Sequence, residues 1–361
     1  MKILMVQDWL RSGGTERQSV FLANAFAGRG HAVTLLTFRP DGKLHGTVSP
    51  LVNRKVLQAR DWKLDWFAPR LSTTARALAP DVILCMGRMA NCRGGELQKA
   101  CPAAAVVATM RTGKPLPWLF RRSLARVRHV VANSEDARHA LERRYGVAVD
   151  KISVIYNSVM FAPVSARVTS TRAELRARFG AQATTTVLLC VAMFRPEKNQ
   201  RELIDIVAGL PRDSDVQLWL AGEGEAKAAC ERAVATSQLK ERVKFVGFLA
   251  DPAPLYEAAD VAVHASASES LSNFLIEAQA HGLPAVAYEA QGISECFVPG
   301  KTGWVVRRGD RDTFQTHLIR LGGEPVEMRR TRAVAAKAFA RERFDSARQV
   351  QAYLELFDGL R

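Results

Sequence analysis

Residues 261–287 have the sequence VAVHASASESLSNFLIEAQAHGLPAVA, and this stretch decides the fold class. An apolar run ends near Ala265, a polar loop follows, and a second apolar run opens at Pro284. Between the two runs we expect a helix that starts at about Ser272, with a serine or asparagine as its cap, and ends at Gly282. Strand, helix and strand in this order form the repeating unit of a parallel α/β sheet.

The same alternation continues along the 361 residues and predicts two α/β domains in tandem. Besides a helix at residues 15–29, strands are expected at residues 2–6, 32–37, 81–85, 105–109, 129–132, 186–192, 215–220, 243–246, 261–263 and 284–287. A stretch rich in Pro, Ser and Thr between Asn157 and Arg172 has the composition of a linker.

We therefore expect one Rossmann-like domain at residues 1–163 and another at residues 164–343, with ligands bound in the cleft that they face. Residues 327–358 have helical periodicity without Gly or Pro, and the helix at about 344–361 is expected to pack back on the first domain.

Composition and cysteine spacing favour a cytoplasmic globular protein. No apolar run reaches the roughly 20 residues of a membrane-spanning helix, and no cleavable signal precedes the first strand. The six cysteines form no CxxC pair, which favours free thiols in a reducing compartment. Neither an Asp-x-Asp pair nor a His cluster with the spacing of metal ligands occurs, so no metal cofactor is expected.

Positive charge is concentrated in the first half of the chain. Residues 1–165 contain 25 Lys and Arg against 11 Asp and Glu, whereas residues 166–361 contain 26 against 25. This excess indicates an anionic partner, which could be lipid headgroups, nucleic acid or a phosphorylated substrate, or else a solvated basic surface without a partner.

Two glutamates flank the predicted helix start in the opening stretch. A helix N-terminus at the carboxyl end of a parallel strand suits a phosphate group. Glu269 precedes that terminus and Glu277 follows it, and ionised carboxylates accept hydrogen bonds from sugar and ribose hydroxyls. The alternative is that Glu269 aids the cap and Glu277 is an ordinary surface residue.

The spacing of these glutamates resembles the E-x7-E signature of retaining glycosyltransferases of the two-Rossmann (GT-B) architecture, in family 4. Residues 278–284 resemble the continuation of that motif, residues 289–310 resemble its tail, and residues 243–260 resemble the segment before it. The resemblance extends over the whole chain and is densest from about residue 186 to 310.

The resemblance assigns donor-binding roles to residues of the second half. It implies that Glu269 binds the donor sugar and Glu277 the ribose, while the loop of Ser270, Leu271, Ser272 and Asn273 contacts the sugar and diphosphate. Lys198 matches the lysine that neutralises the phosphates. The family's arginine five residues before this lysine is replaced by Met193, and we expect Arg195 to substitute for it. Glu269, Lys198 and Arg195 are thus the expected catalytic residues.

Further positions follow from the same resemblance. Gly13 and Gly14 match the family's glycine loop, which faces the diphosphate. Glycines at such a place let the backbone approach a ligand closely. Phe248 is expected either to pack on the nucleotide base or to lie in the core. Arg111 stands where many relatives have a histidine, and it either contacts the acceptor or the phosphates or forms a structural ion pair.

The implied function is metal-independent, retaining transfer of a sugar from a UDP- or GDP-sugar to a cell-envelope glycan or lipid-linked acceptor, such as lipopolysaccharide core or capsular polysaccharide. Alternatives with the same fold are a nucleotide-sugar epimerase and a non-catalytic nucleotide-sugar binding protein. Neither a helix-turn-helix nor an RNP-type motif indicates nucleic acid.

Aromatic and basic residues are interleaved in two segments of the basic half. Residues 114–129 combine Trp118, Leu119, Phe120 and Leu124 with four arginines, and residues 62–67 combine Trp62, Trp66 and Phe67 with Lys63. Such patterns are typical of helices at a membrane interface, so peripheral docking on anionic lipid of the inner leaflet is expected. The alternative is that the apolar residues pack on the sheet while the arginines face water.

Overall fold

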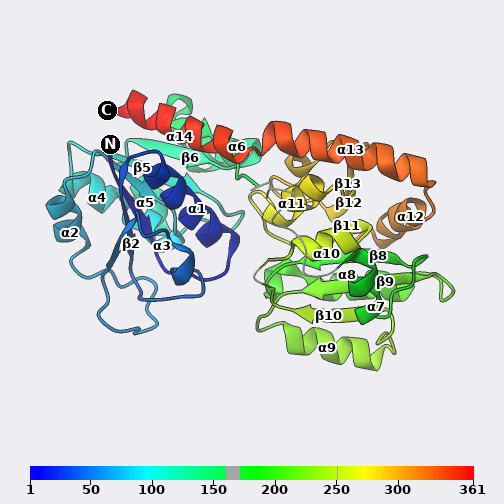
Figure 1. The fold of residues 1–361 in the computed structure, drawn as a ribbon. Coiled ribbons are helices and arrows are strands. Elements are labelled where there is room, and N and C mark those ends of the chain that lie inside the picture. The colour runs from blue at the N-terminus through cyan, green and yellow to red at the C-terminus, as the bar shows by residue number, and fades with distance from the viewer. Residues whose placement is uncertain (160–170, 250) are drawn as a thin grey trace. The chain divides into compact units, whose positions relative to one another are not determined.

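The computed structural model describes residues 1–159, 171–249 and 251–361, which form two compact units (Figure 1). Unit 1 consists of Met1–Ser158 and Ser346–Arg361, and unit 2 consists of Val159–Asp345. The expected domain boundary at residues 163 and 164 lies outside the described residues.

Unit 1 is built on a seven-stranded sheet in the order β3-β2-β1-β4-β5-β6-β7, in which every neighbouring pair is parallel. Its strands are β1 (Lys2–Gln7), β2 (Ala32–Thr37), β3 (Asn53–Val56), β4 (Val82–Cys85), β5 (Ala105–Met110), β6 (His129–Ala132) and β7 (Ile152–Val154). Its helices are α1 (Gly14–Gly28), α2 (Leu71–Leu78), α3 (Arg88–Cys92), α4 (Gly94–Ala100), α5 (Trp118–Leu124), α6 (Glu135–Tyr145) and α14 (Ser346–Leu360), with 3-10 turns η1 (His45–Thr47) and η2 (Val149–Lys151).

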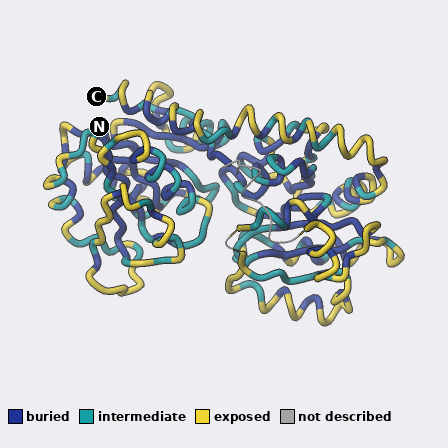
Figure 2. The backbone as a smooth tube through the Cα atoms, in the orientation of Figure 1, coloured by how far each residue is buried: buried dark blue, intermediate teal, exposed yellow. Residues whose placement is uncertain are grey.

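Helices cover both faces of this sheet, so the inner strands β4, β5 and β6 are buried on both sides (Figure 2). Successive side chains of a strand point to opposite faces. In β4, Ile83 packs with residues of helices α2 to α6, whereas Val82 and Leu84 pack with those of α1 and α14. The C-terminal helix thus supplies part of the core of unit 1.

Unit 2 has a six-stranded sheet in the order β10-β9-β8-β11-β12-β13, again with parallel neighbours throughout. Its strands are β8 (Thr186–Val191), β9 (Val216–Ala221), β10 (Val243–Gly247), β11 (Val261–His264), β12 (Ala285–Tyr288) and β13 (Gly303–Val306). Its helices are α7 (Arg172–Arg178), α8 (Gln200–Gly209), α9 (Lys227–Thr236), α10 (Ala253–Ala258), α11 (Asn273–His281), α12 (Arg311–Gly322) and α13 (Val326–Arg343), with 3-10 turns η4 (Pro196–Lys198) and η5 (Ser294–Cys296).

The predicted fold class and all ten predicted strands are confirmed, but three strands were not predicted. β3 is an edge strand with every residue exposed, and β7 has only three residues, so neither carries a buried apolar run. β13 is a four-residue strand that opens with a glycine.

The predicted C-terminal helical stretch is two helices rather than one. Phe344 and Asp345 separate α13 from α14. The backbone oxygen of Phe344 accepts a hydrogen bond from Val159 N at 2.9 Å, and the Phe344 ring is buried, so tertiary contacts interrupt the helical periodicity at this point.

Candidate functional site

The site of unit 2 lies where the order of its strands reverses. β8 and β11 are adjacent parallel strands, but the chain leaves β8 toward β9 and leaves β11 toward β12. Ligands of doubly wound sheets bind at the carboxyl ends of such a strand pair. The loop after β8 carries Lys198 and the loop after β11 carries Glu269, and Lys198 Nζ donates a hydrogen bond to Glu269 Oε1.

Glu269 is a buried carboxylate that stays ionised. Burial by itself raises the pKa of Glu269, but the Lys198 ammonium and the hydrogen bond from His264 outweigh this effect and hold the pKa at about 2. His264 Nε2 lies 3.0 Å from Glu269 Oε1, and the ring must donate there because a carboxylate only accepts. His264 was not predicted as a site residue, although a polar residue that ends a buried strand was a signal for it.

The two loops are also joined through their backbones. Ala267 N and Ser266 Oγ both donate to the backbone oxygen of Glu197, at 2.7 and 3.0 Å. These bonds fix the loop before Glu269 against the turn that carries Lys198. The ion pair is therefore held by the fold and does not depend on the two long side chains alone.

The helix start expected from the sequence is present. Ser272 caps α11, its Oγ accepting from Leu275 N, and Gly282 ends the helix with a φ of 86°. Of the other loop residues, Ser270 and Leu271 are buried, and Ser270 Oγ accepts from Gln291 Nε2 at 3.3 Å. Asn273 is the first residue of α11.

Glu277 lies within α11, half-buried, and has a partner that the sequence did not predict. Tyr256 Oη on α10 donates to Glu277 Oε2 at 2.6 Å. Tyr256 belongs to the segment that resembles the family pattern, but nothing in the sequence shows that its hydroxyl reaches a residue 21 positions away.

Arg195 is half-buried and makes no side-chain hydrogen bond or ion pair with the rest of the described chain. It precedes the 3-10 turn that positions Lys198, whose amide donates to Arg195 O. Because the Arg195 guanidinium has no such partner among the described residues and lies three positions before Lys198, it is available to an anionic ligand.

Two glycines allow the loop after β9 to pack closely against the loop after β8. Gly222 and Gly224 have φ values of 139° and 153°, and a Cβ at either would lie 2.1 Å from Ala192 O or 2.2 Å from Phe194 O. Gly222 N donates to Gly247 O, which brings the loop after β10 alongside. Phe248, next to Gly247, has 39% of its surface exposed and so is not a core residue.

The remaining predicted residues lie in unit 1. Gly13 and Gly14 follow β1 and open α1, with Gly13 at the capping position. Arg111 is held by uncharged partners rather than by an ion pair: Nη1 donates to Asn157 Oδ1 and Nη2 to Tyr353 Oη. The guanidinium thus links the end of β5 to α14.

At the strand reversal of unit 1, between β1 and β4, an acidic side chain caps a helix. Asp8 follows β1, and its carboxylate accepts from Met89 N at 3.0 Å and from Ala90 N at 2.7 Å at the start of α3. Burial, the largest effect, raises the pKa of Asp8 to about 6 against the lowering by these two amides.

Within the described residues, no three His, Cys, Asp or Glu side chains are grouped so that they could hold a metal ion. None of the helices formed by these residues is long and apolar enough to cross a membrane.

Two parallel Rossmann-like sheets are the architecture of GT-B glycosyltransferases, and comparison with known proteins assigns the chain to this class. Residues 12–160 match the family model "Glycosyltransferase Family 4", and residues 185–323 match "Glycosyl transferases group 1". The chain therefore belongs to the family 4 glycosyltransferases, which confirms the resemblance found in the sequence.

Relatives and solved structures agree. The chain is 28% identical, over 84% of its length and 84% of the relative's, to the lipopolysaccharide core biosynthesis glycosyltransferase LpsE of Rhizobium meliloti. It is 27% identical to LpsD of the same organism over 96% of this chain and 95% of the relative. The crystal structure of Anabaena HepE in complex with UDP-glucose superimposes with a TM-score of 0.83, covering 99% of this chain and 100% of that chain at 24% identity.

Proposed function

We propose that this glycosyltransferase transfers a sugar from a UDP-sugar to a lipid-linked or glycan acceptor of the bacterial cell envelope, with retention of configuration and without a metal ion. The names of the two Rhizobium meliloti relatives support the envelope acceptor, and the UDP-glucose complex of HepE supports the donor. The single observation that carries the proposal is the pairing of Lys198 with the largely buried Glu269 at the strand reversal of unit 2.

The ionisation of Glu269 determines what it can do. A carboxylate with a pKa of about 2 is a poor general base near neutral pH, because it holds a proton too weakly. It is well suited to accept hydrogen bonds from the hydroxyls of the donor sugar. In this proposal Glu269 orients the sugar, and the departing diphosphate accepts the proton of the acceptor.

Leaving-group stabilisation falls to the cationic groups and the helix. Lys198 has three N–H donors and uses one on Glu269, so others remain for the diphosphate. Arg195 and the N-terminus of α11 add positive potential where negative charge develops. Glu277 binds the ribose and Phe248 offers an exposed ring to the base.

Substitution of Glu269 tests the proposal. Glu269→Gln keeps the size of the side chain but removes the charge, and we expect transfer from UDP-sugars to fall by about 100-fold or more. Glu241→Gln is the matched control, because Glu241 also pairs with a lysine of unit 2, Lys244, but on the surface. Equal turnover by both variants would refute the role of Glu269.

Two further measurements test stereochemistry and metal dependence. NMR of the anomeric proton of the product should show the configuration of the donor, and an inverted product would refute retention. Transfer should persist in EDTA, whereas loss in EDTA with recovery on adding Mg²⁺ would refute metal independence.

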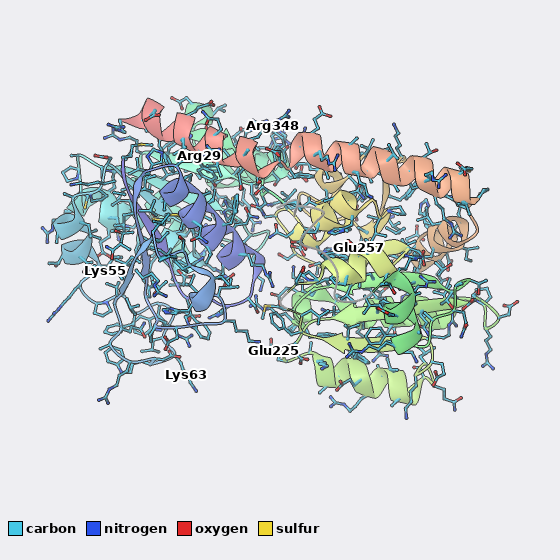
Figure 3. All side chains as sticks on the ribbon, in the orientation of Figure 1. Arg29, Lys55, Lys63, Glu225, Glu257 and Arg348 are labelled. Atoms are coloured by element: carbon cyan, nitrogen blue, oxygen red, sulfur yellow. The ribbon has the colours of Figure 1, made fainter. Side chains whose placement is uncertain are left out.

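We also propose that unit 1 docks on anionic lipid. Trp62 and Trp66 are 49% and 54% exposed on the loop between β3 and α2, and Figure 3 shows Lys63 on the same loop. The loop is held in place, because buried Arg39 pairs with Asp61 at 2.8 Å and with Asp65 at 2.6 Å.

In α5, by contrast, only part of the apolar set is exposed. Phe120 and Leu124 pack in the core, whereas Trp118 and Leu119 are exposed at the start of the helix. The expectation of a fully amphipathic interfacial helix thus applies to its first turn alone, next to exposed Arg121 and Arg122.

Vesicle binding tests this second proposal. The protein should co-sediment with phosphatidylglycerol vesicles, more weakly at high salt, and not with phosphatidylcholine vesicles. Trp62→Ser with Trp66→Ser should weaken binding, whereas Leu51→Ser, which removes an exposed apolar residue elsewhere on unit 1, should not. Equal binding to both kinds of vesicle would count against docking by charge.

A further inference from the structure

Three aromatic rings connect the two glutamates of the site. His264 and Phe274 have ring centroids 6.3 Å apart with planes at 16°, and Tyr256 and Phe274 have centroids 6.0 Å apart at 24°. These are offset-stacked arrangements. All three residues are buried, and they come from the end of β11, the first turn of α11 and the short helix α10.

The two rings that flank Phe274, those of His264 and Tyr256, each form a hydrogen bond with one carboxylate. His264 Nε2 contacts Glu269 Oε1 at 3.0 Å, and Tyr256 Oη donates to Glu277 Oε2 at 2.6 Å. Phe274 itself lies between the two glutamates in the sequence. The stack therefore joins both carboxylates to one rigid element of the core.

We propose that His264 and Tyr256 are positioning residues, which hold Glu269 and Glu277 through their common contact with Phe274 in the arrangement that the nucleotide-sugar requires. This inference rests on the proposed function, because it assigns no new ligand. It adds two residues to the machinery and specifies that they act through the glutamates rather than on the donor.

The physical basis is the cost of ordering a flexible carboxylate. A glutamate side chain with free rotamers loses about 0.5–1.5 kcal/mol of conformational freedom when a ligand fixes it. A glutamate already held by a short charge-assisted hydrogen bond has lost that freedom on folding.

Tyr256 and His264 should therefore affect different steps, which are nucleotide binding and sugar transfer respectively. Tyr256 holds the carboxylate assigned to the ribose, so its loss should weaken nucleotide binding in the ground state. His264 holds the carboxylate next to the reacting carbon, where misplacement matters most in the transition state. We expect Tyr256→Phe to raise the donor KM and His264→Leu to lower kcat.

The first test is calorimetric binding of UDP to the purified full-length protein. Tyr256→Phe removes only the hydroxyl and should raise the Kd for UDP by roughly 2- to 10-fold. Tyr288→Phe is the matched control, because Tyr288 is also a buried tyrosine of unit 2 and donates to Glu202 Oε1 at 3.0 Å. Its Kd should equal that of the wild type.

A double-mutant cycle separates positioning from a general effect on the fold. In a Glu277→Met background, where no carboxylate remains to be held, Tyr256→Phe should cause no further loss of UDP binding. An equal loss in both backgrounds would overturn the positioning role of Tyr256. If Glu277→Met weakens UDP binding but Tyr256→Phe does not, the inference fails and the proposed function stands. If the wild type binds no nucleotide, both fail.

The second test concerns His264. His264→Leu should lower kcat by roughly tenfold with little change in donor KM, since proper orientation near the reacting atoms contributes factors of this size or larger. His264→Gln places an amide N–H close to the position of Nε2 and should restore most of kcat. A kcat equal to that of the wild type in His264→Leu, or no recovery in His264→Gln, would overturn the assignment.

Discussion

The Lys198–Glu269 pair makes a measurable prediction about stability. Lys198→Met removes the positive charge beside a carboxylate that is only 10% exposed. The hydrocarbon of methionine fills most of the space, so the main change is electrostatic. Glu269 then remains buried with His264 as its remaining bonded partner, and its pKa should rise because the largest of the effects that lower it is lost.

The magnitude follows from the pKa of Glu269. A fall from the ordinary 4.5 to about 2 corresponds to about 3 kcal/mol of stability at neutral pH. Lys198 is the largest of the lowering causes, so its loss should cost about 2 kcal/mol. A depressed pKa contributes stability above pH 4.5, which is lost as the pH falls toward 2. In the variant the pKa of Glu269 is lowered less, so Glu269 contributes less stability above pH 4.5 and less is lost as the pH falls.

The assay is urea-dependent hydrogen exchange of peptides from β8 and β11, which reports on unit 2. The difference between wild type and Lys198→Met should be largest at pH 7 and should shrink as the pH is lowered below 4 toward 2. Lys227→Met is the control, because Lys227 is exposed to a similar degree, 23% against 25%, but its partner Glu223 is 49% exposed. A surface pair of this kind contributes about 0–1 kcal/mol. The reasoning is refuted if both variants lose the same stability, or if the loss does not depend on pH.

Two further predictions concern backbone strain in unit 2 and a buried acid in unit 1. Gly224→Ala should lower the free energy of unfolding by about 3 kcal/mol or more and weaken UDP binding, because φ is 153° and the new Cβ would lie 2.2 Å from Phe194 O. Gly180→Ala is the control, because its φ is 72° and the space around it is open, so it should cost about 1 kcal/mol. Equal urea midpoints for the two variants would contradict this prediction. Asp8→Asn should reduce the stability that unit 1 loses between pH 4 and pH 7, because a carboxyl whose pKa is raised to about 6 stabilises the fold below pH 3.8 and this stability is lost as the pH rises through 6. Hydrogen exchange of β1 should show a difference between wild type and variant of at most about 3 kcal/mol. An unchanged pH profile would count against an ionisable role for Asp8.

The sequence was sufficient where local pattern and chain order determine the result. Buried apolar runs located ten strands, and serine and glycine signals located the ends of α11. The Lys198–Glu269 contact itself joins loops 71 residues apart, and only the resemblance to a known family indicated that both residues serve one site.

The hydrogen-bond partners of the site residues became known only from the tertiary structure. A histidine at the end of a strand or a tyrosine in a short helix has many possible roles, and only the packing around Phe274 shows which carboxylate each one reaches. Arg111 illustrates the same limit, because its partner Tyr353 lies 242 residues further along the chain. Such pairings depend on the completed fold, which local propensities do not encode.

The C-terminal helix has a consequence for biosynthesis. Val350, Tyr353 and Phe357 of α14 belong to the core of unit 1, and the Phe357 ring lies 5.7 Å from that of Phe26 in α1. While the ribosome is still translating unit 2, the part of α1 that packs on α14, including Phe26, has no cover. Unit 1 is therefore the first part of the chain to be synthesised and among the last to be completed, and a product that stops before residue 346 should be a substrate for chaperones or proteases.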